Sequence, residues 1–191
     1  MTEVAPDLSG ASPGEPSGGP SDGPLPFFVY GTLRPGEHNH DLFLRGRTVR
    51  EEPAGLAGAL LYDGPGYPYA VESPDGVESR GAGAGPGAGA GPGAGTGPGA
   101  APGALVVGEL VTAASSAYAE LLSVLDELEG YRAPGDPRNL YERAARDVLR
   151  ADGTAVRAWV YFAAPRTARD LRRRGRLIAG GDWLAHITPA P

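Results

Sequence analysis

The sequence has no cysteine and no lysine, and each absence narrows what the chain can do. Without cysteine, neither a disulfide framework nor a thiolate metal site is possible. All 17 basic residues are arginine, which we attribute to a bias in composition rather than to function. Acidic residues outnumber basic residues by 23 to 17, and the net charge of −6 argues against nucleic acid as the main partner.

Long apolar runs are also missing. No stretch of the sequence is long enough to span a membrane, so a membrane partner is not expected. The N-terminus lacks the basic start and the apolar run that are typical of a secretory signal peptide. The sequence therefore predicts a protein located in the cytoplasm.

Two segments contain too little apolar surface to join a core. Residues 1–24 are almost entirely Pro, Gly, Ser, Ala and acidic residues, which predicts a disordered tail. Residues 81–104 alternate Gly and Ala with recurring Pro, which breaks strand ladders and predicts a flexible linker. The expected organisation is one domain over residues 25–191, interrupted by a flexible insertion at about 75–104. Such a domain is large enough for a single hydrophobic core.

Most of the remaining patterns are typical of strands. Apolar or alternating stretches predict strands over residues 25–33, 56–62, 67–72, 105–112, 141–149 and 156–162. The insertion falls between the third and fourth of these strands. We expect a hairpin tip there, because the entropy of closing a loop grows only slowly with its length.

One helix is predicted over residues 117–129, which read AYAELLSVLDELE. Either Ser115 or Ser116 is expected to cap its N-terminus, and Gly130 stands where a left-handed residue commonly ends a helix. The tyrosine and leucines of this stretch recur at a spacing that places them on one face. The helix is therefore expected to pack that face against the core.

Glu129 is the anomalous acid of this helix. It follows Leu125 by four residues and so falls within the apolar stripe, whereas Glu120, Asp126 and Glu127 fall on the side that faces water. Burial and the negative end of the helix dipole would both raise the pKa of Glu129. A carboxyl of that kind suits general acid–base catalysis. The alternatives are that the side chain bends out to solvent or pairs with an arginine.

A second candidate feature is the stretch YGTLR at residues 30–34, where a strand-like run stops at a glycine. Successive backbone N–H groups in a turn after a strand can form a concavity that binds anions, although an ordinary β-turn is the alternative. A Cβ at Gly31 would block a positive φ or crowd a bound ligand. Arg34 adjoins this loop, and Pro35-Gly36 is expected to turn its side chain outward, with contact to a carboxylate as the alternative.

Two other groups of residues were considered as sites. His38, His40 and His186 are the only histidines, and the first two are expected to cap a turn rather than bind a metal, so no metal site is predicted. The arginine-rich run at 166–176 favours a solvated helix face, with recognition of an anionic substrate or partner as the alternative.

The stretch FFVYGTLRPGEHNH (residues 27–40), followed later by LDELEGY (residues 125–131), resembles the gamma-glutamylcyclotransferase-like superfamily, in particular its AIG2-like and BtrG-like branch. Members of this branch have a Y-G-[TS]-L loop after the first strand and a glutamate in a D-x-x-E-G segment at the end of a helix. The stretches VVGELV, YERAARDV and IAGGDW are similar to further elements of the family. The resemblance covers about residues 25–187.

The resemblance implies an α+β fold: a small mixed-sheet β-barrel with flanking helices. It also implies a cofactor-independent enzyme of the acyltransferase or lyase type. Such an enzyme would cyclise a gamma-glutamyl amine or peptide, a small-molecule partner, to 5-oxoproline and release a free amine or amino acid. The alternative is a non-catalytic module of the same fold that binds a small molecule.

The resemblance also assigns roles to individual residues. Glu129 would be the general acid and base of the reaction. The residues expected to bind the substrate are Tyr30, Gly31, Thr32 and Leu33, through their backbone N–H groups. Apart from the resemblance, Tyr141 is a candidate for binding the substrate through its hydroxyl, and Tyr161 carries a second such hydroxyl. For both tyrosines, ordinary packing in a strand is the alternative.

Overall fold

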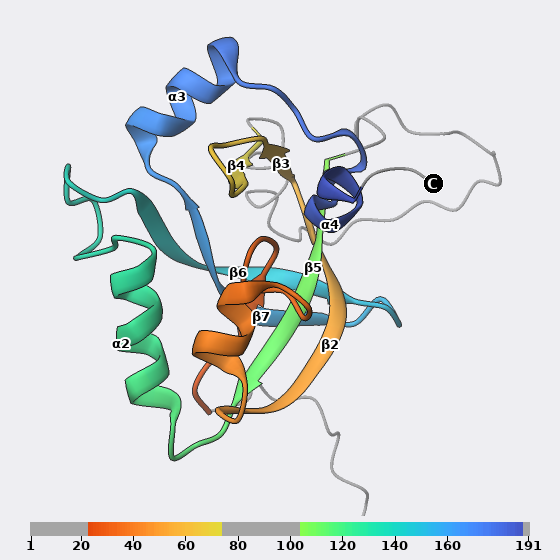
Figure 1. Cartoon of the computed structure of the whole chain (residues 1–191), viewed down its shortest axis with the longest axis vertical. Helices are drawn as coiled ribbons and strands as arrows, with labels where there is room; N and C mark the ends of the chain where they lie inside the picture. The colour runs from red at the N-terminus through yellow and green to blue at the C-terminus, as the bar shows by residue number, and fades with distance from the viewer. Residues whose placement is uncertain (1–22, 74–103, 189–191) are drawn as a thin grey trace, which may run out of the picture.

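The computed structural model describes residues 23–73 and 104–188 (Figure 1). The expected N-terminal tail and the expected insertion at about 75–104 lie outside the described residues, except for a few residues at their ends. Within the described part, none of the helices is long and apolar enough to cross a membrane.

Five strands form a closed barrel in the order β1-β5-β2-β6-β7. Neighbouring strands pair antiparallel, except that β1 pairs parallel with β7 at Phe27 and Trp159 and so closes the sheet. The strands are β1 (Phe27–Val29), β2 (Thr48–Ala57), β5 (Leu105–Ala113), β6 (Tyr141–Arg150) and β7 (Ala155–Ala163). This mixed-sheet barrel with flanking helices confirms the predicted α+β fold class.

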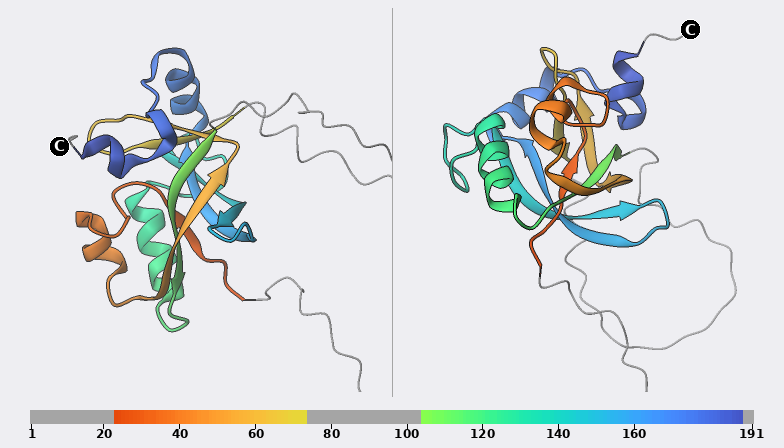
Figure 2. Two further views of the ribbon diagram at one scale, coloured as in Figure 1. Left: turned by 90° about the vertical axis from the view of Figure 1, so that its right-hand side faces the viewer. Right: turned by 60° about the horizontal axis from the view of Figure 1, so that its bottom comes forward.

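The remaining elements surround the barrel. Strands β3 (Ala59–Tyr62) and β4 (Tyr69–Glu72) form a separate two-stranded sheet. Helix α2 stands beside the barrel, whereas α3 and α4 lie at the end where β3 and β4 are found (Figures 1 and 2). The helices are η1 (His40–Leu44, a π-helix), α2 (Tyr118–Leu128), α3 (Pro165–Arg174), η2 (Ala179–Gly181, a 3-10 helix) and α4 (Trp183–Ile187).

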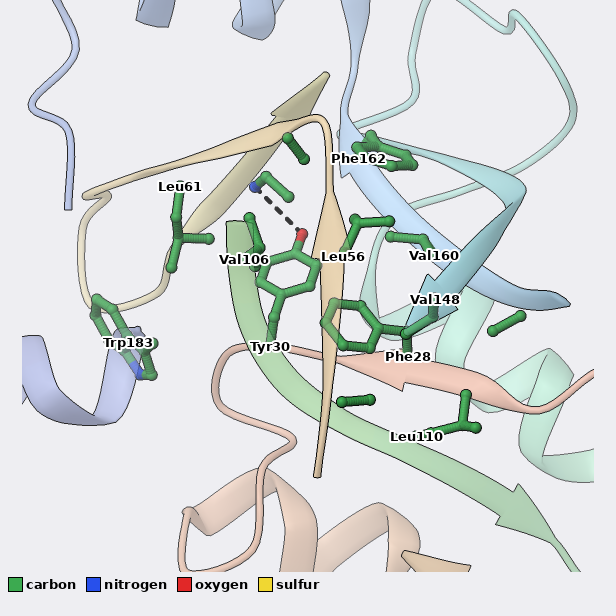
Figure 3. Close-up of a cluster of buried hydrophobic side chains, with 14 of the residues drawn as sticks. Phe28, Tyr30, Leu56, Leu61, Val106, Leu110, Val148, Val160, Phe162 and Trp183 are labelled. Atoms are coloured by element: carbon green, nitrogen blue, oxygen red, sulfur yellow. Dashed lines mark hydrogen bonds between the residues drawn. The ribbon is translucent and has the colours of Figure 1, made fainter. Parts of the chain in front are cut away.

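Strand β1 separates two hydrophobic clusters, because successive side chains of a strand point to opposite faces. Phe28 packs inside the barrel with residues such as Leu110 and Val160 (Figure 3). Phe27 and Val29 pack on the other face, in the cluster that contains Leu121 and Leu125 of α2. The loop that follows β1 therefore begins where the barrel core and the α2 layer meet.

The strand predictions differ from the structure in three respects. The first predicted strand, 25–33, ends at Val29, because the chain leaves the sheet and turns. The predicted strand over 56–62 is divided between β2 and β3 at Gly58, whose φ is 75°. The first half of β2 was missed because most of its side chains are polar and none is buried, so they carry no apolar signal.

Helix α2 ends as the sequence predicts but begins differently. Gly130 has φ 60°, and its N–H donates to the carbonyl of Glu127 at 3.1 Å. The N-cap is Ala117 and makes no side-chain capping bond, so the prediction of a serine cap was wrong. The chain instead enters the helix through a turn in which the N–H of Ala117 donates to the carbonyl of Ala114 at 2.9 Å.

Candidate active site

A cavity of about 330 Å³ opens next to the C-terminal end of α2. Its walls come from the loop after β1, the last turn of α2, the turn between β3 and β4, and residues at the start of β6 and near the end of β7. Every site residue predicted from the sequence lines this cavity: Tyr30, Gly31, Thr32, Leu33, Glu129 and Tyr141. The tertiary structure thus brings the two motifs of the sequence together in one place.

The loop after β1 is both a turn and a wall of the cavity. The N–H of Arg34 donates to the carbonyl of Gly31 at 3.0 Å, which closes a four-residue turn. Within the described part of the chain, the N–H groups of Gly31, Thr32 and Leu33 donate to no acceptor. Asn39 donates from its amide to the Thr32 hydroxyl at 2.9 Å and also lines the cavity. These three N–H groups are therefore available to an anionic ligand group.

The side chain of Tyr30 serves the fold. Its hydroxyl donates to the carbonyl of Tyr161 at 2.5 Å and accepts from the N–H of Ala70 at 3.4 Å, the contact that is dashed in Figure 3. Burial raises the pKa of Tyr30, with a smaller contribution from the charge of Glu129, so the phenol stays neutral. The protein's own groups thus occupy this hydroxyl, and it ties the start of the loop to β4 and β7.

Glu129 is the C-cap residue of α2, and its side chain lines the cavity. In the described part of the chain its carboxyl makes no ion pair and no hydrogen bond, so the arginine partner that the sequence left open is not found there. Burial raises the pKa of Glu129 from its ordinary value of 4.5 to about 7. Glu127, two residues earlier, is exposed. Glu129 is thus a half-buried carboxyl that titrates near neutral pH.

An aromatic wall faces the loop after β1. It is made by Tyr67 and Pro68 of the turn between β3 and β4, by Tyr69 at the start of β4 and by Tyr141. Tyr141 donates from its hydroxyl to the carbonyl of Pro68 at 3.1 Å, and its ring stacks on Tyr69 with 5.2 Å between the centroids. Burial raises the pKa of Tyr69 and Tyr141, so both of these phenols are neutral. The prediction of a strand over residues 67–72 did not indicate this contribution to the cavity.

The prediction that Asp126 faces water was wrong. Its carboxylate accepts from the hydroxyl of Tyr161 at 2.7 Å and from Nη1 of Arg143 at 2.6 Å. These two side chains come from β6 and β7 and reach the flank of α2. Tyr161 lines the cavity, and burial is the main cause that raises its pKa. The group of Asp126, Arg143 and Tyr161 therefore lies directly behind the cavity wall.

Arg34 is buried rather than turned outward, which contradicts the prediction from Pro35-Gly36. Only 6% of its surface is exposed. Its Nε and Nη2 donate to the carboxylate of Glu109 at 2.7 and 2.9 Å, and its Nη1 donates to Asp182 at 2.6 Å. Because β1 pairs with β5, Glu109 lies next to the loop and draws the guanidinium inward. These contacts fasten the end of the loop to the protein itself.

The histidines do not converge. Nε2 of His40 lies 3.0 Å from a carboxylate oxygen of Glu51, His186 lies 3.6 Å from Asp63, and His38 is exposed. Residues 23–73 and 104–188 contain no group of three or more histidines and carboxylates that could hold a metal ion.

The arginine-rich run forms α3 and the segment after it. Arg172 donates to the carbonyl of Glu72 at 2.9 Å, and Arg176 pairs with Asp63. These contacts tie the run to β4 and to the end of β3. The exposed arginines are Arg166, Arg169, Arg172, Arg173, Arg174 and Arg176.

Comparison with known proteins gives the family. Residues 27–82 and 88–185 match the family described as gamma-glutamyl cyclotransferase, AIG2-like. A gamma-L-glutamyl-butirosin B gamma-glutamyl cyclotransferase from Niallia circulans is 33% identical over 134 residues, which are 70% of this chain. The chain spans 64% of the length of that relative.

Solved structures with a similar arrangement include an AIG2-like protein from Mus musculus, which is 19% identical with a TM-score of 0.49 over 83% of this chain and 87% of that one. Another is an uncharacterized protein from Pyrococcus horikoshii, 18% identical with a TM-score of 0.46 over 84% of this chain and 90% of that one. The family match includes both the loop after β1 and the helix end at Glu129. The chain belongs to the gamma-glutamyl cyclotransferase, AIG2-like family.

Proposed function

We propose that this protein cyclises gamma-glutamyl amines or peptides and releases 5-oxoproline with a free amine or amino acid. One observation carries the proposal: the unpaired carboxyl of Glu129 shares a cavity with the available N–H groups of the loop after β1. Family membership and the name of the relative from Niallia circulans, a gamma-glutamyl cyclotransferase, support this class of reaction.

The loop is assigned to the glutamyl group of the substrate. That group carries an α-carboxylate and a gamma-carbonyl, and both need hydrogen-bond donors. In the proposed complex, the N–H groups of Gly31, Thr32 and Leu33 bind the α-carboxylate or the oxyanion that develops on the gamma-carbonyl oxygen. The cavity of about 330 Å³ is of a size that suits so small a group.

Glu129 is assigned to the proton transfers. The ionised carboxyl takes a proton from the α-ammonium, and the freed amine nitrogen attacks the gamma-carbonyl carbon to close a five-membered ring. The ring nitrogen then gives up a second proton, and the bond to the leaving nitrogen breaks as Glu129 passes protons to that nitrogen. The two protons lost by the α-ammonium thus leave on the released ammonium group, and no water and no net proton are consumed. Because the pKa of Glu129 is about 7, both protonation states are populated near neutral pH.

So small a set of groups is sufficient because nucleophile and electrophile belong to one molecule. The entropic cost of bringing two reactants together is therefore largely absent. What the protein supplies is the folded conformation of the glutamyl chain, the donors for its oxygens and one carboxyl. The proposed reaction needs no cofactor.

The test compares Glu129→Gln with Glu127→Gln on a panel of gamma-glutamyl amides, with 5-oxoproline as the measured product. Glutamine keeps the size of the side chain but cannot accept the proton, so turnover should fall by ~10² to 10⁴ while substrate binding is largely kept. Glu127 is exposed, and its variant should match the wild type. Unchanged turnover in Glu129→Gln, or equal losses in both variants, would contradict the assigned role.

A second outcome separates catalysis from binding alone. If calorimetry detects binding of a gamma-glutamyl compound but the wild type releases no 5-oxoproline from any member of the panel, the protein is a binding module on the same fold. The available N–H groups of the loop would serve either function, whereas an unpaired, half-buried carboxyl serves only the enzyme.

A further inference from the structure

We propose that Arg143 is a positioning residue for Glu129, because the Arg143 guanidinium contacts both ends of the turn that carries the Glu129 carboxyl. The inference rests on the function proposed above, since it concerns the group assigned to proton transfer. It adds a residue of the barrel to the two parts of the site that the sequence already indicated, which are the loop after β1 and the end of α2.

The turn around Glu129 is closed by two backbone hydrogen bonds. The N–H of Tyr131 donates to the carbonyl of Asp126 at 2.8 Å, and the N–H of Gly130 donates to the carbonyl of Glu127 at 3.1 Å. With Gly130 in the left-handed region, this is a Schellman motif. Glu129 lies within this turn, so the direction of its side chain depends on the turn staying closed.

Arg143 contacts the side chains of the two residues that close this loop. Its Nη1 donates to Asp126 at 2.6 Å, and its guanidinium carbon lies 4.9 Å from the centroid of the Tyr131 ring. The same guanidinium lies 4.8 Å from the centroid of Trp159 on β7. Arg143 itself is on β6, so one side chain joins both ends of the turn to two strands of the barrel.

The ion pair between Arg143 and Asp126 is largely buried, and a further hydrogen bond supports it. A positioning role requires both. The side chains of Arg143 and Asp126 are 16% and 24% exposed, so solvent screens their attraction only in part. Tyr161 donates to the other oxygen of Asp126 at 2.7 Å. A planar guanidinium can pair with a carboxylate and lie over aromatic rings together, which a lysine ammonium cannot do in the same way.

Glu129 needs such a support because nothing bonds its carboxyl in the described part of the chain. Apart from the Asp126–Arg143 pair behind it, the titratable groups that line the cavity with Glu129 are tyrosines: Tyr30, Tyr67, Tyr69, Tyr141 and Tyr161. Burial raises the pKa of four of them, so these phenols stay neutral: Tyr30, Tyr69, Tyr141 and Tyr161. An ionised carboxyl is more stable in water than in this cavity. If the turn opened, the side chain would move toward solvent and the pKa of Glu129 would fall toward 4.5.

The test measures the pKa of Glu129 by carbon NMR of its carboxyl in Arg143→Met and Arg143→Lys. Positioning by Arg143 predicts that this pKa falls from about 7 toward 4.5 in both variants. A purely electrostatic effect has the opposite sign, because loss of a nearby positive charge would raise the pKa in Arg143→Met and leave it unchanged in Arg143→Lys. A fall is therefore specific to loss of position.

Arg146→Met is the matched control. Arg146 lies on the same strand, pairs with the carboxylate of Glu72 at 2.6 Å, and its guanidinium carbon is 5.5 Å from the centroid of Phe162. It thus makes the same two kinds of contact, but with residues outside the turn. The pKa of Glu129 and the turnover of a gamma-glutamyl amide should both match the wild type in this variant.

In kinetic terms, Arg143→Met should lower kcat by ~10² while KM changes much less, because a displacement of about 1 Å in a catalytic group costs this much. An unchanged or raised pKa of Glu129 in the folded Arg143→Lys protein would overturn the proposal, whether or not Arg143→Met folds. If the wild type releases no 5-oxoproline, the proposed function fails, yet the NMR measurement needs no substrate and still decides the role of Arg143.

Discussion

At the scale of single residues, Glu127 and Glu129 show how position decides chemistry. They are two residues apart on one helix end, but Glu127 is exposed and Glu129 lines a cavity. Helical periodicity is enough to separate them, because it places Glu129 in the apolar stripe. The sequence also led us to expect an effect of the helix dipole, whereas burial alone accounts for the raised pKa of Glu129.

The raised pKa of Glu129 makes stability depend on pH. Between about 4.5 and about 7 the folded state holds a proton that the unfolded state has lost. The free energy of unfolding therefore falls as pH rises through this window, by roughly 3 kcal/mol in total. Glu129→Gln removes this contribution, so it should gain stability over the wild type at pH 8 but much less at pH 5. Urea unfolding at both pH values, with Glu127→Gln as control, measures this; a difference that is independent of pH would contradict it.

Gly31 is expected to tolerate substitution poorly, although not because of a positive φ, which was one of the two reasons that the sequence suggested. Its φ is not in the left-handed region, but a Cβ there would lie 2.8 Å from Cγ and Cδ of Pro68. Gly31→Ala should therefore displace Pro68, whose carbonyl accepts from Tyr141, and cost about 1 to 3 kcal/mol. Urea unfolding measures the cost and calorimetry the accompanying loss of ligand affinity. Gly23→Ala, where no atom lies within 4 Å, is the control and should change neither.

At the scale of the elements, Arg34 joins three segments that are distant in the sequence. It links the loop after β1 to Glu109 on β5 and to Asp182, which also accepts from the N–H of Leu184 at 3.0 Å at the start of α4. The loop is therefore fixed at one end by the pairing of β1 and at the other by Arg34. Neither the burial of Arg34 nor its partners could be predicted from YGTLR alone.

Removal of Arg34 should destabilise the fold strongly. Arg34→Met leaves the carboxylate of Glu109, whose side chain is 14% exposed, without its partner, and breaking such a buried pair costs about 3 to 5 kcal/mol. Arg50→Met removes an exposed arginine that pairs with Glu52 at 2.7 Å, and it should cost about 1 kcal/mol or less. Chemical unfolding of both variants measures these losses. Equal losses would show that the Arg34 group stabilises no more than a surface pair.

Strands were predictable where their two faces differ in burial. Strands β5 and β7 are largely apolar toward the core, and the predicted ranges 105–112 and 156–162 agree with them to within one residue at each end. The short stretch of β1 was overestimated, because the apolar residues after Val29 line a loop and a cavity instead of a sheet. Apolar character indicates burial, and it does not distinguish a strand from a buried loop.

At the scale of the whole molecule, the two residues that flank positions 74–103, Ser73 and Ala104, both form a hydrogen bond with Gly58. The N–H of Ser73 donates to the carbonyl of Gly58 at 2.8 Å, and the N–H of Gly58 donates to the carbonyl of Ala104 at 2.9 Å. The barrel and the sheet of β3 and β4 are thus joined through Gly58 on either side of the insertion. A short connection could bridge these ends.

Deletion of residues 1–22 and replacement of residues 74–103 by a four-residue Gly-Ser linker should leave one cooperative thermal transition. The described elements make their contacts without these residues, and shortening a loop lowers the entropic cost of closing it. Calorimetry of the double variant, and of each change alone, measures the transition. Loss of the cooperative transition would mean that one of these segments belongs to the folded domain.

The features that the amino-acid pattern determined are local: the turn at residues 31–34, the amphipathic helix with its left-handed glycine, and the place of Glu129 within the apolar stripe of that helix. Each follows from the spacing of neighbouring residues, because local backbone geometry decides which way each side chain points. The resemblance to the family added the expectation that the loop and the glutamate share one site.

Tertiary structure alone decided which segments meet. The aromatic wall from the turn between β3 and β4, the partners of Arg34 and the contacts of Arg143 with Asp126 and Tyr131 join residues from different elements. Hydrophobic periodicity shows that a side chain is buried but not against which partner, because that depends on how the barrel closes and where α2 packs. For the same reason the sequence placed Asp126 in water and Arg34 outside: each is a charged residue that only a distant partner could hold in the interior.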